Sequence, residues 1–508
     1  MKLIPSEKSE SQIVTPKMLR PFNTSTTSLF AIIIIASLLR LYHLEYRSVW
    51  LDEATQFFIS TRPLLNIKDL GHPPLSHYLL HFWLFLGKND LMLRLPSVFF
   101  GVGSIIFIFL LGKYLFDERT ALFGSFFASI SPFLIYYSQE ARMYSQFLFF
   151  STASLFFFLL TYHKGSLRYY TAYGISTILS LYTHFFSLFV ILAHNFVVFL
   201  SFRKSKLPLK NWLGIQMILL ILFIPGFMLL FETIREHSST TSFNLIPTLS
   251  SIFYIFSFGR VFLPIKLNIL IIAIGSIGFL ILFILGILDI AKNRNWKYLF
   301  FLSYTLTFLS ILFVNFKFKA FNEQNIRYLI FFAPLYYVLI SKGLTSIRNA
   351  NIRRLALATI LGTSAFALYP YYFEWDRTGK GNFRGAAEYI DHNLLTEDDI
   401  IFYSDRHIRK PFAYYLKRQP RQDVIDSTLP DIDKIGRAKR IFVVGYSEKL
   451  ALGVIRGQKF EAEPWLDKHV EEHLSKSGYS KANEKSWAGK KRIDIFVYEK
   501  HIPKDFVK

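Results

Sequence analysis

The chain has 508 residues and no cysteine. Disulfide bonds, a thiolate nucleophile and a cysteine-ligated metal are therefore excluded, and thiol usage says nothing about the compartment. Charged residues are also few, at 19% of the chain, whereas 52% of the residues are hydrophobic and 18% are aromatic. These proportions exclude a disordered, a collagen-like and a disulfide-rich protein.

Long uncharged hydrophobic runs are the main feature that is present. Examples are FAIIIIASLL from Phe30 and MILLILFIPGFMLLF from Met217, and such runs are typical of segments surrounded by lipid. A hydropathy window of roughly 19 residues predicts about eleven spans. We therefore predict a mainly α-helical protein, a polytopic transmembrane helical bundle. The predicted spans cover residues 27–45, 92–115, 121–137, 145–162, 169–186, 186–201, 212–231, 267–290, 298–316, 328–341 and 355–372.

The basic charge is concentrated in the hydrophobic part of the chain. Most of the net charge of +22 lies in the first 372 residues, because residues 373–508 hold 26 basic and 22 acidic side chains. Nucleic-acid binding explains this poorly, since the excess lies in short loops between hydrophobic spans. The positive-inside rule explains it better and places these loops in the cytoplasm. Their basic residues are Lys164, Arg168, Arg203, Lys204, Lys206, Lys210, Lys292, Arg294, Lys297, Lys342, Arg348, Arg353 and Arg354.

This pattern predicts a multi-pass protein of the cell (inner, plasma) membrane. We expect residues 1–26 to form a cytoplasmic N-terminal segment and residues 27–372 to form the transmembrane module. The first span superficially resembles a signal peptide, but bulky residues 40–43 follow it instead of a small-residue cleavage site, so we expect a retained helix. The loops expected outside the cytoplasm cover residues 46–91, 138–144, 232–266 and 317–327.

Residues 373–508 have a different character. Short runs of apolar and aromatic residues begin at Asp399, Arg440 and Arg492 and predict β-strands. A helical pattern begins at Gly385 between them. About 130 residues suffice for a small α/β unit with its own core. We therefore predict a soluble, extracytoplasmic α/β domain at the C-terminus.

The first outward loop contains adjacent carboxylates, Asp52 and Glu53, soon after the first span. Repulsion and partial burial raise the pKa of such a carboxyl group and can make it a competent base. A solvated start of a loop is the alternative, but Trp50 and the hydrophobic residues after Glu53 indicate a helix lying against the membrane. His72 follows in the same loop, where two prolines stiffen the backbone after it.

Ionisable residues also lie in the second outward loop. Glu140 and Arg142 stand between strongly hydrophobic spans in a loop too short to leave the membrane interface, where such groups are usually paired or functional. An ion pair between them that only caps the helix ends is the alternative. His184 lies at the outward end of a span among aromatic residues, a setting that more often gives a hydrogen-bonded packing residue than a ligand.

The last outward loop is basic, against the topology rule, because it contains Lys317, Lys319 and Arg327. A cluster of cations near the outer membrane surface suits an anionic lipid headgroup, above all a phosphate. The alternative is simple snorkelling of long side chains at helix ends. Arg327 is the strongest candidate for a phosphate ligand.

Metal-ligand spacing is not evident in the sequence. No His-x₃-His or comparable pair exists. A metal would need carboxylates and an imidazole assembled from different loops, for instance Glu53 or Glu140 with His72. A divalent metal ion is therefore left open as the one candidate cofactor.

Six motifs can be compared with known families. They are Arg47-Ser-Val-Trp-Leu-Asp-Glu-Ala54, His72-Pro-Pro-Leu75, Arg94-Leu-Pro-Ser97, Ser131-Pro132 with Tyr137-Ser-Gln-Glu-Ala-Arg-Met-Tyr144, Thr183-His-Phe185, and Arg327-Tyr328 followed by Pro334. Together they resemble glycosyltransferase family 39 of the GT-C superfamily. This family includes enzymes like the dolichyl-phosphate-mannose protein mannosyltransferases and the aminoarabinose transferases. The order and spacing of the motifs, across roughly residues 30–340, make the resemblance specific at the superfamily level.

The resemblance implies a membrane glycosyltransferase. Such an enzyme moves a mannose-like or aminoarabinose-like sugar from a polyprenyl-phosphate-linked donor to a hydroxyl or phosphate of a cell-envelope glycan, lipid or protein. Asp52 takes the place of the catalytic base, Glu53 completes the acidic pair, and some relatives bind a divalent cation nearby. The implied donor-binding residues are Arg142, Arg327, Tyr144 and Tyr328, and the implied positioning or metal-binding residues are His72, Glu140 and His184.

The chemistry of the expected donor agrees with these roles. A sugar phosphate already has a good leaving group, so the enzyme needs a base for the acceptor and cations for the departing phosphate. Direct displacement would invert the anomeric centre. The C-terminal region does not match the repeat-containing inserts of eukaryotic protein mannosyltransferases, which argues against a protein acceptor and favours a bacterial branch.

Two other functions share part of this pattern. A lipid-linked-glycan transporter or flippase would place ionisable groups near the membrane midplane, often in two related halves, whereas the polar groups here gather at one face and no internal repeat is found. A polysaccharide polymerase or ligase would share the outward topology and the lipid-linked substrates but would lack the early acidic pair. The expected partners are the donor, the acceptor and membrane lipids, with no nucleic acid.

Overall fold

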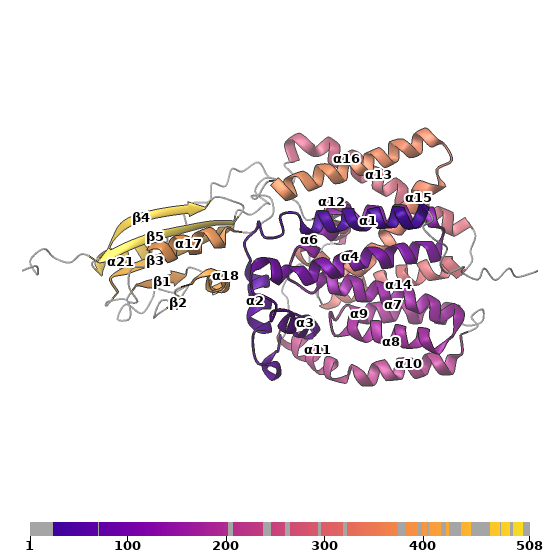
Figure 1. Cartoon of the computed structure of the whole chain (residues 1–508), viewed down its shortest axis with the longest axis horizontal. Helices are drawn as coiled ribbons and strands as arrows, with labels where there is room; N and C mark the ends of the chain where they lie inside the picture. Colours follow the sequence, from indigo (N-terminus) through magenta and orange to yellow (C-terminus); the bar gives the residue numbers. More distant parts are fainter. Residues whose placement is uncertain are drawn as a thin grey trace, which may run out of the picture.

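The computed structural model describes residues 24–69, 71–201, 207–236, 245–259, 265–292, 296–318, 323–373, 381–393, 399–403, 406–417, 423–425, 438–448, 468–477, 479–487 and 491–500. Figure 1 shows two parts side by side along the long axis, a helical bundle and a smaller part built on a β-sheet. The short helices α2 (Leu51–Ser60) and α3 (Leu75–Trp83) lie at the end of the bundle that faces the sheet.

In the described residues, the bundle and its loops contain the first sixteen α-helices and two 3₁₀ helices. Besides α2 and α3, these are α1 (Thr24–Leu41), η1 (Leu64–Asn66), α4 (Asp90–Leu115), α5 (Glu118–Ser129), α6 (Pro132–Ser138), α7 (Tyr144–Lys164), α8 (Leu167–Leu181), α9 (Ser187–Leu200), α10 (Leu209–Leu222), α11 (Ile224–Glu236), α12 (Leu245–Phe258), α13 (Ile265–Lys292), α14 (Trp296–Phe318), η2 (Glu323–Phe332), α15 (Ala333–Ser346) and α16 (Ala350–Phe373).

The chain is a multi-pass membrane protein, but the predicted number of spans is not confirmed. Within the described ranges, six helices are long and apolar enough to cross a membrane, or eight if each of two bent helix pairs counts as one span. Every predicted span overlaps a helix. Three of the eleven predicted spans fail the length test, because α8, α9 and the apolar part of α1 each have fewer than 18 residues.

The predicted outward loop 232–266 also differs from the structure. It contains the apolar helix α12, whose Phe256 and Phe258 are buried. Phe256 stacks on Phe133 of α6 with ring centroids 4.9 Å apart, and it contacts Tyr336 of α15 edge-on. The hydrophobic run of this segment therefore packs into the bundle instead of facing water.

Arg40 holds the bend between α5 and α6, which meet at an angle of 58°. This fully buried arginine donates hydrogen bonds to the carbonyls of Ala128 and Ser129 at the end of α5, at 3.3 and 2.9 Å. It also donates to the hydroxyl of Ser138 at the end of α6, at 3.1 Å. Backbone carbonyls freed at a helix break inside a membrane need such a partner. The bend brings residues 139–143 to the end of the bundle near the sheet.

Where the structure describes it, the sheet part contains five strands with helices on both faces. Its elements are α17 (Phe383–Asn393), β1 (Ile400–Tyr403), α18 (Arg406–Tyr415), β2 (Asp423–Ile425), β3 (Arg440–Glu448), α21 (Lys468–Lys476), β4 (Tyr479–Trp487) and β5 (Lys491–Lys500). The strand order is β2-β1-β3-β5-β4, with β1 parallel to β2 and β3 and the other pairs antiparallel. The three strands expected from the sequence lie in β1, β3 and β5.

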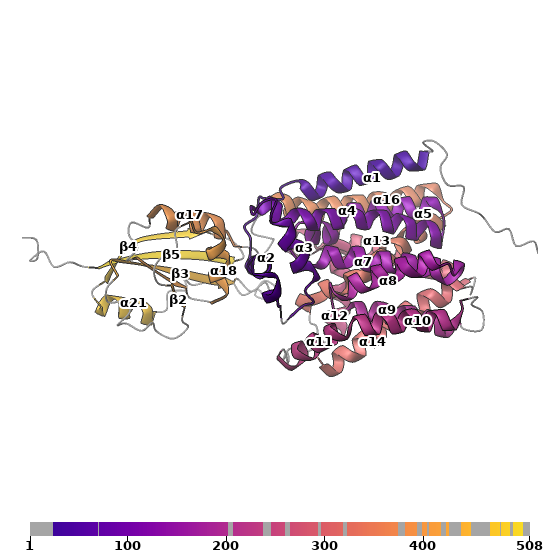
Figure 2. The ribbon, with the colours of Figure 1, turned by 60° about the horizontal axis from the view of Figure 1, so that its bottom comes forward.

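The alternation of side chains along the strands builds two small cores. Tyr403 and Ile495 point to the face covered by α17 and α18, where Phe383 and Phe412 are buried. Phe402 and Phe496 point to the opposite face, where Leu474 of α21 is buried. Figure 2 shows α17 and α21 on opposite sides of the sheet. Because successive side chains of a strand face opposite ways, strands buried on both faces consist of apolar residues at nearly every position.

Candidate active site

Helix α2 carries both acidic residues and is fixed from two sides. Asp52 and Glu53 lie in its first turn, directly after Trp50, where the helix dipole favours negative charge. Trp50 packs against the core of the sheet part, and Phe57 meets Tyr414 of α18 edge-on at 4.9 Å. The helix is therefore held between the bundle and the sheet part.

Glu53 is fully buried and bound by Arg94 of α4 in a two-point ion pair. Glu53 Oε1 accepts from Arg94 Nε at 2.8 Å, and Glu53 Oε2 accepts from Arg94 Nη2 at 2.9 Å. The backbone N–H of Ala141 also donates to Glu53 Oε1, at 3.0 Å. Arg94 donates in addition to the carbonyls of Leu44, Arg47 and Ser48. This arrangement suits a buried charge that fixes the loops around α2.

Asp52 points elsewhere and remains partly accessible. Its Oδ2 atom lies 3.7 Å from Nη2 of Arg327, and the exposed fraction of its side chain is 24%. Arg142 Nη1 lies 3.4 Å from the backbone carbonyl of Asp52 and 3.5 Å from Oε1 of Gln56. One reachable carboxylate thus stands beside two guanidinium groups.

The two arginines come from loops far apart in the sequence. Arg142 is buried; although burial works against its charge, the carboxylate of Asp52 raises the pKa of Arg142 above its usual value. Arg327 lies in η2, with its guanidinium 5.2 Å from the ring centre of Tyr144 and 5.9 Å from that of Tyr328, distances typical of cation–π contacts. The sequence-predicted residues Arg142, Arg327, Tyr144 and Tyr328 therefore meet in one place. Of the three cations in the last predicted outward loop, Arg327 has a described side chain, and Lys319 lies outside the described residues.

Two histidines and Tyr328 form an aromatic wall of the same site. The ring of His184 lies 5.8 Å from that of His72 and 4.9 Å from that of Tyr328, and it stacks on Phe147 at 4.8 Å. Burial and the charge of Arg142 hold the pKa of His72 well below its usual range. Burial and the charge of Arg327 lower the pKa of His184 to about 3. Both imidazoles are therefore neutral near pH 7.

Several buried donors of the site have no hydrogen-bond partner among the described residues. They are Nε of Arg142, Nε of Arg327, the hydroxyl of Tyr144 and Nε2 of His184. Nδ1 of His184 accepts from the backbone N–H of Phe186 at 3.1 Å, so the ring proton is placed on Nε2. Buried donors without partners are costly, and all four belong to residues of the site around Asp52.

Glu140 lies in the tight turn that carries Arg142. It is buried, and its carbonyl accepts from the backbone N–H of Arg142 at 2.7 Å. The guanidinium of Arg142 reaches Asp52 and Gln56, so it contributes to the site instead of only capping a helix. The role predicted for Glu140 stays a prediction.

The residues of the site do not fit a divalent metal ion. Among the described residues, no group of three or more His, Asp or Glu side chains is placed to hold one. Glu53 is occupied by Arg94, and Asp52 faces Arg327, so a further cation would be repelled.

Asp69 belongs to the site and was not identified from the sequence. Its carboxylate accepts from the N–H of Gly71 at 2.9 Å and lies 3.1 Å from Nε2 of His77. Although burial opposes ionisation, the hydrogen bonds from His77 and from the N–H of Gly71 hold the pKa of Asp69 well below its usual range. Asp69 thereby fixes the turn that presents His72. An acidic residue two positions before a glycine is a common turn signal, which offers a weak clue to this role.

The comparisons with known proteins place this geometry in a known fold. A family model described as dolichyl-phosphate-mannose-protein mannosyltransferase matches residues 71–229. The structure of ArnT from Cupriavidus metallidurans in the apo state aligns with a TM-score of 0.58 at 13% identity, covering 93% of this chain and 98% of that one. The chain has the GT-C fold. The resemblance seen in the sequence is thus confirmed at the superfamily level.

Other GT-C structures align as well. ArnT from C. metallidurans bound to undecaprenyl phosphate gives a TM-score of 0.57 at 12% identity, covering 93% of this chain and 97% of that one. The archaeal oligosaccharyltransferase AglB from Archaeoglobus fulgidus, in complex with an inhibitory peptide and a dolichol-phosphate, gives 0.54 at 13% identity, covering 83% and 69%. No curated protein sequence matches the chain. At these identities the alignments establish the GT-C fold, and the reaction has to be argued from the site.

Proposed function

We propose that this GT-C protein is a glycosyltransferase with a polyprenyl-phosphate-linked sugar as donor. It moves a mannose-like or aminoarabinose-like sugar to a hydroxyl or phosphate of a cell-envelope glycan, lipid or protein. One observation carries the proposal: the reachable carboxylate of Asp52 faces Arg327, Arg142 contacts the backbone carbonyl of Asp52, and the buried donors around them have no hydrogen-bond partner in the described part of the chain. A base beside an anion-binding site is what transfer from a sugar phosphate requires.

The reaction needs one proton acceptor and one stabilised leaving group. The acceptor oxygen forms a bond to the anomeric carbon while the bond from that carbon to the phosphate oxygen breaks, and the electron pair of the broken bond goes to the phosphate. Asp52 takes the proton of the acceptor. A single displacement of this kind inverts the anomeric configuration.

The guanidinium groups of Arg142 and Arg327 bind the donor phosphate and stabilise the charge that develops on it. The hydroxyl of Tyr144 and Nε2 of His184 donate to the same group, because both are buried donors that have no hydrogen-bond partner among the described residues. His72 is neutral and orients the sugar or the acceptor by hydrogen bonding. In this scheme Glu53 positions α2 through Arg94 and does not itself react.

An apolar pocket beside η2 offers a place for the lipid tail. It has a volume of about 510 Å³ and is lined by side chains of α12, α13, α14, η2 and α15. Leu329 and Phe332 line it, and both lie on η2, the element that carries Arg327. A polyprenyl chain in this pocket therefore leads toward the phosphate-binding arginines, which supports a lipid-linked donor.

We also propose the topology that the charge pattern indicates. Eleven helical spans, some of them short or bent, carry residues 27–372 across the inner membrane with residues 1–26 in the cytoplasm. Residues 373–508 then form an extracytoplasmic domain. The contacts of α18 with α2 support this arrangement, since they require the sheet part and Asp52 to lie on the same side.

The test is transfer by the purified full chain with synthetic short-chain polyprenyl-phosphate sugars, with and without a chelator. We expect release of polyprenyl phosphate with at least one donor and at least a hundredfold loss in Asp52→Asn, because the base is removed. Glu118→Gln is the matched control, since this exposed carboxylate pairs with Lys113 on the surface. Transfer in Asp52→Asn at the rate of the unmodified chain would refute the role of Asp52. Silence with every donor in folded protein would instead favour the transporter alternative.

A further inference from the structure

A second pocket lies at the end of the bundle opposite to Asp52. It has a volume of about 540 Å³ and is formed where α13 and α15 end. The path of the chain separates the pocket from the candidate active site. Arg327 of η2 lies at the candidate active site, and η2 continues into α15. Helix α15 ends at Ser346, which lines the pocket. The pocket is therefore remote from the proposed chemistry.

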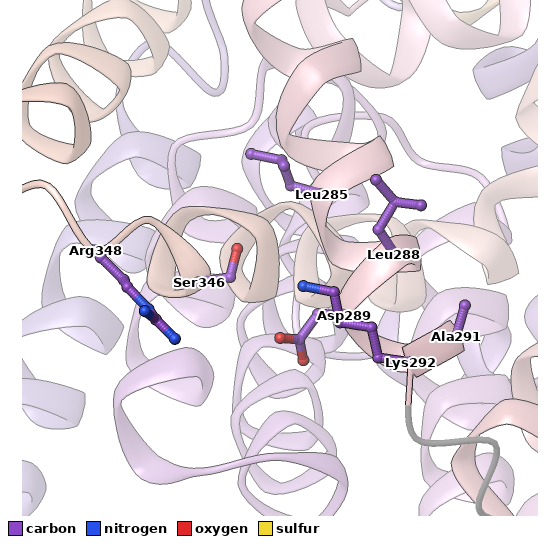
Figure 3. A pocket seen from close by; sticks show the side chains of 7 residues that line it. All are labelled: Leu285, Leu288, Asp289, Ala291, Lys292, Ser346 and Arg348. Carbon is purple, nitrogen blue, oxygen red and sulfur yellow. The ribbon is translucent and has the colours of Figure 1, made fainter.

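The charges around this pocket are unbalanced. Asp289 lies 3.3 Å from Lys342, so that carboxylate is already neutralised. Lys292 and Arg348 also line the pocket, and both are exposed. Neither has a carboxylate within ion-pair distance among the residues that the structure describes. Figure 3 shows their charged ends pointing from opposite sides toward the same space, with the carboxylate of Asp289 beside the end of Lys292.

One edge of the pocket is apolar and continues along the outside of the bundle. Leu285 and Leu288 line it, and Leu288 has an exposed fraction of 51%. Ile281 and Ile284, about one turn earlier on α13, are also exposed. In a membrane protein such a face contacts acyl chains. The pocket thus joins two cations, neither of which has a carboxylate partner in the described ranges, to an apolar surface that suits acyl chains.

We propose that this pocket binds the headgroup of an anionic phospholipid. The phosphate lies between Lys292 and Arg348, and an acyl chain follows the exposed face of α13. The positive-inside pattern places this end of the bundle at the cytoplasmic leaflet, and basic pockets between membrane helices on that side suit anionic headgroups. A soluble anion would use the two cations but not the apolar edge. The proposal does not depend on the glycosyltransferase function.

The experiment measures lipid binding to the delipidated full chain by native mass spectrometry in a neutral detergent. The probes are phosphatidylglycerol and phosphatidylcholine with identical acyl chains, and millimolar inorganic phosphate as a competitor. We expect phosphatidylglycerol to bind about tenfold more tightly than phosphatidylcholine and to resist displacement by phosphate. The double variant Lys292→Gln/Arg348→Gln should lose about tenfold in affinity for phosphatidylglycerol, whereas Lys292→Arg/Arg348→Lys should keep it.

The matched control is Lys164→Gln/Arg168→Gln. It removes two charges at the end of α7 and the start of α8, on the same side of the bundle but outside the pocket. We expect its affinity to stay within twofold of the unmodified chain. Three results would each overturn the proposal: unchanged binding in the pocket variant, an equal loss in the control, or displacement of the lipid by inorganic phosphate.

Discussion

The carboxylate of Asp52 lies 3.7 Å from the guanidinium of Arg327, and this pair joins a helix near the start of the chain to a 3₁₀ helix 275 residues later. Each partner has a second task in the proposed reaction, because Asp52 must accept a proton and Arg327 must bind a phosphate. When a donor phosphate binds Arg327, the carboxylate of Asp52 loses its ion-pair partner and becomes a better base. The ion pair thus links donor binding to activation of the acceptor.

Glu53→Gln should lower the stability of the folded chain. The substitution leaves Arg94 as a buried cation without its carboxylate, and breaking a buried pair in this way costs about 3–5 kcal/mol. Thermal unfolding in detergent measures the effect. In Glu118→Gln, which breaks an exposed pair, we expect a change of at most about 1 kcal/mol. Equal melting temperatures for the two variants would show that the Arg94 pair does not fix α2.

Tyr415→Phe should loosen α2 although the residue lies in the sheet part. The hydroxyl of Tyr415 donates to Asp90 at 2.5 Å and accepts from the N–H of Val49 at 2.7 Å. Burial and Asp90 raise the pKa of Tyr415, so this hydroxyl stays protonated at neutral pH. We expect faster hydrogen exchange of the α2 amides.

The control for this variant is Tyr389→Phe. Tyr389 lies in α17, and its hydroxyl has no hydrogen-bond partner among the described residues. Its removal should leave the exchange of α2 unchanged. If Tyr415→Phe behaves like Tyr389→Phe, the sheet part does not position the helix that carries Asp52.

Stability should fall as the pH is lowered below the ordinary pKa of histidine. The pKa of His184 is about 3 in the folded chain and near 6.5 when unfolded, so the unfolded state binds more protons between these values. Its contribution is complete above pH 6.5 and is lost at about 1.4 kcal/mol per pH unit below it. Unfolding at pH 7, 5.5 and 4.5 measures this slope, and His184→Gln should flatten it. An unchanged slope in that variant would contradict burial of a neutral imidazole.

Gly343→Ala should weaken the contact between α13 and α15. A Cβ atom at Gly343 would lie 1.9 Å from the carbonyl oxygen of Leu282. Because this oxygen belongs to the backbone, the clash can be relieved only by a shift of one of the two helices. We expect a lower melting temperature, because small residues allow close packing of membrane helices. Gly362→Ala is the control, since nothing lies within 4 Å of its added Cβ. A Gly343→Ala chain as stable as the control would refute this packing.

Much of the site could be predicted from the sequence because charged residues beside hydrophobic spans are rare enough to stand out. Asp52, Arg142, Arg327 and His184 were identified on this basis and by the resemblance, and the structure brings them together. The pairing of Glu53 with Arg94 could not be predicted, since it joins residues 41 positions apart through the packing of α2 on α4.

Other features depended on tertiary packing in the same way. Asp69 acts through a turn, and a single acidic residue in a loop gives no pattern of its own. His194 was overlooked among apolar residues, yet it is fully buried, with Tyr304 at 3.2 Å and Tyr173 at 3.4 Å. The helix α12 was assigned to a loop because its short apolar run cannot be separated from an interfacial segment by hydropathy alone.

The most direct test of the central claim separates binding from chemistry in Asp52→Asn and Arg327→Gln. The measurement is the affinity of each purified variant for a short-chain polyprenyl phosphate. We expect Asp52→Asn to bind it at least as tightly as the unmodified chain, because Arg327 is released from its carboxylate, and Arg327→Gln to bind about tenfold more weakly. Both should lose transfer. A loss of affinity in Asp52→Asn as large as that in Arg327→Gln would contradict a carboxylate base set against a phosphate-binding arginine.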